Sequence, residues 1–243
     1  MKQYLLIIFS LTGIFGAFAQ RSDNRFEGYV VYSDGTRKDQ IIEVEDPALP
    51  WTFQYDVRTF DKALLGAGKI KKEQKKALDP IEVKEYGFGN RKFVAVSYYI
   101  KGEDEDNILK SAYGKFKGDK NTDYFAEVIR DGKVKMLKFY IPPVITDEDY
   151  EDDKVIAEKE NKAKGTFDIL LVRDGFKPES IDGVSFKTFF SDCDVVVKKY
   201  EDGKYRMKPG KSLKAMFKGD KLPGIKLEEA AQQVMAEYDA SCR

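Results

Sequence analysis

The sequence contains no histidine, and this absence removes several classes of chemistry. Without an imidazole there is no Ser-His-Asp or Cys-His catalytic arrangement and no histidine-based zinc or copper site. Cysteine is nearly absent too: Cys193 and Cys242 are the only two, too few for a structural zinc site within one chain. Any catalysis would have to rest on carboxylate, lysine, tyrosine or serine groups, and we expect no bound metal.

The chain also has no excess of either charge, with 42 Lys and Arg residues against 42 Asp and Glu residues. A balanced surface gives no electrostatic reason for binding nucleic acid or an anionic membrane. The sequence further lacks a Walker A loop, a dinucleotide fingerprint and a nucleophile elbow. We therefore expect no nucleic-acid partner, no cofactor and no catalytic residues.

Long apolar runs are missing except at the N-terminus, where residues 4–18 are almost entirely hydrophobic. Lys2 precedes this run, and Ala17-Phe18-Ala19 after it has the small-x-small pattern of a cleavage site. The pattern predicts a Sec-type signal peptide over residues 1–19, with the mature chain beginning at Gln20. The alternative is a membrane anchor, but a run of about 15 residues is shorter than the roughly 20 needed to span a bilayer.

Export places the mature protein in the periplasm or outside the cell. No cysteine directly follows the apolar run, so we expect no lipid anchor, and no later segment is apolar enough to form a transmembrane helix. The mature chain is predicted to be soluble.

Residues 20–184 have the pattern of an antiparallel β-rich region. Alternating apolar and aromatic segments are separated by Asp-Gly and Gly-Asn turn signals. The expected strands span residues 26–32, 40–44, 51–55, 81–88, 92–100, 124–130, 133–140 and 167–172. The clearest hairpin joins residues 125–129 to 134–139 through Asp131-Gly132, for which we expect a type I′ turn with positive φ at the glycine.

Residues 185–243 change to helical periodicity. Phe186, Phe189 and Phe190 recur at helical spacing, and Asp192 or Asp194 is a candidate N-cap for a following helix. The best amphipathic stripe lies in residues 227–238. It consists of Leu227, Ala230, Ala231, Val234, Met235 and Tyr238, with Glu228 and Glu229 expected in its first turn. The fold class is therefore α+β, with a β-rich front portion and a helical C-terminal region that could form one continuous domain with it.

The second half resembles a group of uncharacterised secreted bacterial proteins. The resemblance spans about residues 120–243 and rests on the strand pair at 125–140, the aromatic segment 186–190, Ser191-Asp192-Cys193 and the final Tyr238-Asp239-Ala240-Ser241-Cys242. It implies export and this architecture, and it implies no chemistry.

Export also bears on the two cysteines, because an oxidising compartment favours their pairing. With only two cysteines there is one intramolecular connectivity, so we predict a Cys193–Cys242 disulfide that holds the terminal helix. The alternative is two unrelated cysteines, one buried and one exposed near the chain end.

Three further features are candidate ligand sites, each with a simpler interpretation. The acidic runs 103–107 and 147–153 offer oxygen ligands for calcium but lack the central glycine of an EF-hand-type loop, which favours solvated segments. The lysine-rich segment 61–78 is interpreted as an exposed connection. Trp51 could stack on a sugar, although its place between Pro50 and an apolar segment favours burial.

These observations lead to two hypotheses of function. The first is an exported, non-catalytic module with a binding or structural role, whose partner is an envelope protein or a polysaccharide. The second is a carboxylate-dependent hydrolase acting on an extracellular polymer, which would need two facing carboxylates about 5–10 Å apart in a deep cleft.

Overall fold

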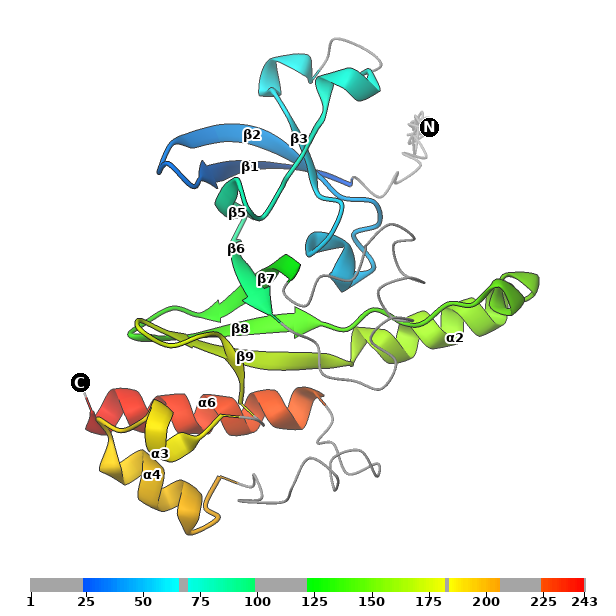
Figure 1. Ribbon diagram of the computed structural model, residues 1–243. Helices are drawn as coiled ribbons and strands as arrows, with labels where there is room; N and C mark the ends of the chain where they lie inside the picture. Colours follow the sequence, from blue (N-terminus) through cyan, green and yellow to red (C-terminus); the bar gives the residue numbers. More distant parts are fainter. Residues whose placement is uncertain (1–23, 66–69, 99–121, 182–183, 206–223, 243) are drawn as a thin grey trace, which may run out of the picture.

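A ten-stranded antiparallel sheet forms the body of the protein, with a layer of helices packed under one end (Figure 1). The computed structural model describes residues 24–65, 70–98, 122–181, 184–205 and 224–242. The strand order is β10-β9-β8-β7-β6-β5-β1-β2-β3-β4. The α+β class is confirmed, and the expected signal peptide at residues 1–19 lies outside the described residues.

The strands shorten toward both edges of the sheet. Seven of the inner strands span six to nine residues and β3 has three, whereas the outermost strands β4 and β10 have two each. The bounds are β1 Arg25–Tyr32, β2 Arg37–Glu43, β3 Arg58–Phe60, β4 Lys76–Ala77, β5 Val83–Phe88, β6 Arg91–Tyr98, β7 Thr122–Arg130, β8 Val134–Tyr140, β9 Phe167–Arg173 and β10 Glu179–Ser180.

Strand β1 lies at the centre of the front portion, paired with β2 on one side and β5 on the other. Its Gly28 allows a close approach between strands, because a Cβ there would lie 2.2 Å from the Gly87 carbonyl oxygen and 2.9 Å from Ile42 Cγ1. The front core is aromatic, and the Phe53 ring stacks on both Phe88 and Phe93.

Strand β7 connects the two halves of the sheet. Its first part pairs with β6 from Thr122 to Glu127, and its last part pairs with β8 from Glu127 to Arg130. At Tyr140, the last residue of β8, the side chain of Gln54 makes the hydrogen bonds that a neighbouring strand would otherwise make. Its amide group donates to the Tyr140 carbonyl at 2.9 Å and accepts from the Tyr140 N–H at 2.5 Å. A buried amide that meets both backbone groups keeps the diverging sheet hydrogen-bonded.

The segment around Trp51 corrects our expectation of a strand at residues 51–55. Residues Pro50–Phe53 form the 3-10 helix η1, with the proline at the helix start, where its missing N–H costs nothing. All residues from 51 to 55 are buried, so the alternation of apolar and polar residues there does not reflect a strand with one buried and one exposed face. Trp51 is 5% exposed, which confirms burial over a sugar-stacking surface.

The β7–β8 hairpin forms as predicted, but its turn differs from the expected type I′. The register shifts between Val128 and Arg130, and three residues, Asp131 to Lys133, separate the strands. The φ of Gly132 is not among the positive values, and a Cβ there would meet nothing nearer than the Val134 carbonyl oxygen at 3.7 Å. The expected type I′ turn with positive φ at Gly132 is therefore wrong. Positive φ does occur in the other described Asp-Gly turns, at Gly35, Gly175 and Gly203.

In the described part of the chain, three helices form the layer beneath strands β8 and β9: α3 Phe186–Phe189, α4 Asp194–Glu201 and α6 Gly224–Ser241 (Figure 1). All six residues of the predicted amphipathic stripe are buried on α6. Because α6 begins at Gly224, Glu228 and Glu229 lie beyond its first turn, which corrects our expectation; Glu228 pairs instead with Lys138 of β8 at 2.7 Å.

Strands β8 and β9 are covered on both faces, which explains their nearly continuous apolar character. Met136 and Ile169 face the helices, whereas Leu137 and Leu170 pack with Trp51 on the other side. The helical region and the sheet therefore share one core.

Residues 147–164, which begin with the second acidic run, form helical structure. They comprise the 3-10 helix η4 Asp147–Glu151 and the helix α2 Asp153–Lys164. The acidic side chains of this run serve helix starts: Asp149 accepts from Thr146 N–H, and Asp152 accepts from Lys154 N–H at 2.8 Å. Such caps satisfy N–H groups that have no partner within a helix.

The predicted disulfide is present between Cys193 and Cys242, with a Cα–Cα distance of 5.4 Å. It joins the N-cap of α4 to the residue after α6, so the two helices run antiparallel and are covalently joined at one end. The cap prediction is wrong, because neither Asp192 nor Asp194 occupies the N-cap position and Cys193 makes no side-chain cap bond.

Candidate functional site

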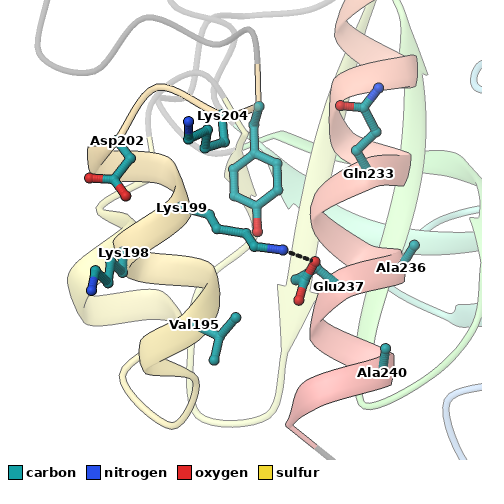
Figure 2. A pocket seen from close by; sticks show the side chains of 10 residues that line it. Val195, Lys198, Lys199, Asp202, Lys204, Gln233, Ala236, Glu237 and Ala240 are labelled. Carbon is teal, nitrogen blue, oxygen red and sulfur yellow. Dashed lines mark hydrogen bonds and ion pairs between the residues drawn. The ribbon is translucent and has the colours of Figure 1, made fainter.

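An open groove of about 820 Å³ lies between helices α4 and α6, on the side of the helical layer away from the sheet core. Figure 2 shows α4 on one side and α6 on the other, with side chains from both helices meeting across the gap. The lining residues are Val195, Lys198, Lys199, Asp202, Lys204, Tyr205, Gln233, Ala236, Glu237 and Ala240.

The surface of the groove is mostly apolar at the end nearest the disulfide. Val195 of α4 is 42% exposed, and Ala236 and Ala240 of α6 are exposed as well. On the core-facing sides of the same helices, Val196 and Val234 are fully buried and hold the helices together. Branched and small apolar side chains that remain open to solvent between two packed helices offer space for an apolar group from a ligand.

An ion pair crosses the groove near its middle. Lys199 Nζ of α4 donates to Glu237 Oε2 of α6 at 2.5 Å (Figure 2). The hydrogen bonds from Lys199 and Ser241 lower the pKa of Glu237 below its ordinary value. Both side chains are partly exposed, at 44% and 25%, so the pair contributes little free energy and can open when a competing charge arrives.

Tyr205 is the aromatic residue of the groove, and its hydroxyl is unusual. The side chain is 4% exposed, and the buried hydroxyl has no hydrogen-bond partner among the described residues. Burial, together with the charge of nearby Glu237, raises the pKa of Tyr205 to about 12, so this group stays a protonated donor at neutral pH. A buried donor without an acceptor is a cost in the free protein.

Lysine side chains line the α4 side of the groove. Lys198 and Lys204 are exposed, and neither forms an ion pair within the described part of the chain, whereas Lys199 is engaged by Glu237. Asp202 is the remaining acidic residue of the lining. The groove therefore combines an apolar surface with free positive charge.

A second, smaller hollow of about 470 Å³ lies along the exposed side of α6 and includes Ile225, Glu229 and Gln232. Ile225 is 61% exposed. The hollow is bounded by residues of this one helix, so we treat it as surface relief and do not consider it a separate site.

A polar cluster around Asp192 fixes the helical layer behind the groove. Its carboxylate accepts from Arg173 at 2.7 Å and from both Lys133 and the Tyr238 hydroxyl at 2.8 Å. Burial raises the pKa of Asp192, but the hydrogen bonds from Lys133, Tyr238 and Arg173 outweigh it and hold the pKa well below its usual range. One carboxylate thus joins β9, the β7–β8 turn and α6 next to the disulfide.

The other candidates from the sequence have different places in the structure. The acidic run 103–107 lies outside the described residues, and the run 147–153 caps helices. Within the described ranges no group of three or more Cys, Asp or Glu side chains is placed to hold a metal ion. Most described side chains in segment 61–78 are exposed, but Lys75 pairs with Glu43 at 2.5 Å in a largely buried position.

The groove does not favour carboxylate-dependent hydrolysis. Its two carboxylates belong to Glu237 and Asp202. A general acid of this class needs a raised pKa, whereas the pKa of Glu237 is lowered. The groove is also open, and it offers no enclosed position between the two carboxylates.

Comparison with known proteins gives no match: no family model fits the chain, and neither a curated protein nor a solved structure is detectably similar. None of the helices in the described part of the chain has the length and apolar character required to cross a bilayer.

Proposed function

We propose that the protein is an exported, non-catalytic binding module of the cell envelope or the extracellular space, and that it binds its partner in the groove between α4 and α6. The observation that carries this proposal is the solvent-exposed apolar surface of Val195, Ala236 and Ala240 between two helices joined by a disulfide. Exposed apolar surface in a concave site is typical of recognition, because a ligand that fills it removes that surface from water.

The anchoring of the two helices supports the same role. The disulfide and the Asp192 cluster hold α4 and α6 in position, so the groove exists before a partner arrives. A site formed in advance binds with a smaller loss of conformational entropy. The sequence pattern of residues 1–19 supports export, which is also the condition under which the disulfide persists.

Site-specific photo-crosslinking in the native cell tests this proposal. A photoreactive phenylalanine analogue at Ala236, in the groove, is compared with the same analogue at Ala157, an exposed alanine of helix α2 far from it. We expect a discrete crosslinked adduct from position 236 and none from position 157. Absence of an adduct from position 236, or the same adduct from both positions, would contradict a binding role for the groove.

Export has a separate test. Mass analysis of the protein recovered from its native cell is expected to give an N-terminus at Gln20, in free or cyclised form. Recovery of a chain that still begins at Met1 would disprove the processing.

A further inference from the structure

We infer that the groove between α4 and α6 takes a segment of a protein partner in which an apolar side chain stands next to an acidic one, and that the Tyr205 hydroxyl donates a hydrogen bond to a backbone carbonyl of that segment. This inference rests on the proposed function and adds the chemistry of the ligand. Three properties of the groove carry it, and a peptide of this kind satisfies all three.

The first property is the unused donor. The Tyr205 hydroxyl is buried, lines the groove and lacks an acceptor among the described residues. Neighbouring Glu237 has its charge compensated by Lys199, and the partly exposed Lys199 side chain can shift to admit a ligand atom while its ammonium group stays paired with Glu237. A carbonyl oxygen arriving there would satisfy the hydroxyl, so binding would remove a cost that the free protein carries.

The second property is the charge of the lining. Lys198 and Lys204 have no ion-pair partner in the described structure, and the Lys199–Glu237 pair neutralises itself. Apart from Glu237, Asp202 is the acidic residue of the lining that can offset the charges of Lys198 and Lys204. A carboxylate on the ligand complements this rim and would be repelled by no other uncompensated acidic group of the lining.

The third property separates a peptide from a sugar polymer. Carbohydrates bind through the exposed faces of aromatic rings, but the aromatic residue of this groove, Tyr205, is 4% exposed. The accessible apolar surface comes instead from Val195, Ala236 and Ala240. Such a surface suits a branched aliphatic side chain, which a peptide supplies together with carbonyl acceptors and carboxylates.

The test uses small probes and the oxidised protein purified after export. N-acetyl-leucyl-aspartate amide carries all three features, its asparagine counterpart lacks only the charge, and N-acetyl-alanyl-aspartate amide lacks the large apolar group. Binding is followed by NMR chemical shifts of the labelled protein, which detect even millimolar affinity. We expect saturable shifts around Val195, Tyr205 and Ala240, with at least about fivefold weaker binding of the two control probes, which corresponds to about 1 kcal/mol.

Two variants with matched controls test the individual contacts. Tyr205→Phe is expected to leave the free protein as stable as before or more so, while weakening the leucyl-aspartate probe about fivefold, because only the bound state uses the hydroxyl. Tyr238→Phe, which removes the hydroxyl bonded to Asp192, should show the reverse pattern of lower stability and unchanged affinity. Lys198→Gln should weaken the aspartate probe and leave the asparagine probe unaffected, and Lys154→Gln on α2 should affect neither.

Several outcomes would overturn the inference. They are the absence of saturable shifts at tens of millimolar probe, equal affinity for the aspartate and asparagine probes, and loss of stability in Tyr205→Phe. Tighter binding of trigalacturonate would assign the groove to an acidic polysaccharide, and shifts of the same residues on raising the protein concentration alone would assign it to a second copy of the chain. If crosslinking from position 236 succeeds while the probes fail, the proposed function stands and the ligand chemistry is wrong.

Discussion

The two ends of the sheet are stabilised in different ways. At the front, around β1, β5 and β6, the core is a stack of rings: Tyr86 lies parallel to Phe93 at 4.8 Å between centroids, and Phe53 stacks on Phe93. At the rear, around β8 and β9, the helices are held by a disulfide and by the ionised carboxylate of Asp192. The front core is dominated by stacked rings, with ion pairs such as Lys75–Glu43 beside it, whereas the rear depends on a disulfide as well as on charge.

This difference matters because the groove belongs to the rear. Stacked aromatic rings retain their packing across a wide range of pH and redox conditions. The disulfide responds to redox conditions and the ion-pair cluster responds to pH, so both conditions can change whether α4 and α6 stay aligned. In the function we propose, the front is the scaffold and the rear is the binding face, which is complete only once Cys193 and Cys242 have been oxidised.

The largest effect that would sharpen this comparison is loss of the disulfide. Replacing Cys193 and Cys242 with serine opens a loop with a sequence separation of 49 residues, and the chain-entropy model gives a loss of about 4 kcal/mol for a loop of this size. Hydrogen exchange should rise first in α4 and α6 while β1, β5 and β6 stay protected. Uniform loss of protection through both ends would show that the two regions are not separable.

The next effect concerns the front. Gly28→Ala places a Cβ within 2.2 Å of the Gly87 carbonyl oxygen, which forces β1 and β5 apart. We expect a loss of about 3 kcal/mol in the free energy of unfolding, measured by urea denaturation. The matched control is Gly132→Ala, where the nearest atom is 3.7 Å away, and this variant should unfold at nearly the wild-type urea concentration.

A smaller effect is expected from one buried hydroxyl. Tyr86 is fully buried and donates a hydrogen bond to the Phe53 carbonyl, which connects η1 to the front core. Tyr86→Phe keeps the stacked ring but leaves that carbonyl without this donor, for an expected loss of about 2 kcal/mol in thermal or urea unfolding. A variant as stable as the wild type would mean that the rings alone position η1.

The smallest expected effect is a pH-dependent loss of stability at the rear of the sheet. Asp192→Asn should cost about 1 kcal/mol at neutral pH, because the charge that accepts from Arg173 and Lys133 is lost. The pKa of Asp192 is lowered in the folded protein, so the carboxylate contributes stability above the unfolded-state pKa near about 4 and loses it as pH falls toward the folded value. The gap between variant and wild type should therefore shrink below about pH 4. A gap of constant size down to pH 2 would contradict this role.

Local patterns predicted the elements whose partners are nearby in the sequence. Alternation and Asp-Gly turns located the β1–β2 and β7–β8 hairpins, and the helical stripe from Leu227 to Tyr238 located α6. The pattern misidentified residues 51–55 because all of them are buried by distant strands, so no exposed face revealed their geometry. The Asp131-Gly132 turn was misassigned because the bulge between Val128 and Arg130 changes the loop.

The candidate site was harder to predict because it belongs to two helices. Val195, Lys198 and Asp202 recur at helical spacing, as do Gln233, Ala236 and Ala240, so each helix face could have been recognised by itself. The sequence gives no sign that these two faces meet, or that Tyr205 is buried between them. Asp192 illustrates the same limit, since its local position suggested a cap while its partners lie 19, 46 and 59 residues away.

The shortness of the outermost strands limits how this molecule can meet others. An incoming β-strand binds a sheet by pairing with the free N–H and C=O groups along its rim. Here the outermost strands are β4, with Lys76 and Ala77, and β10, with Glu179 and Ser180, and each offers only two residues of backbone to a guest. A longer guest would have to continue along the parts of β2 and β9 that β3 and β10 leave uncovered, so each rim is stepped. A stepped rim disfavours fibril growth and strand donation, because a straight incoming strand cannot pair along its whole length.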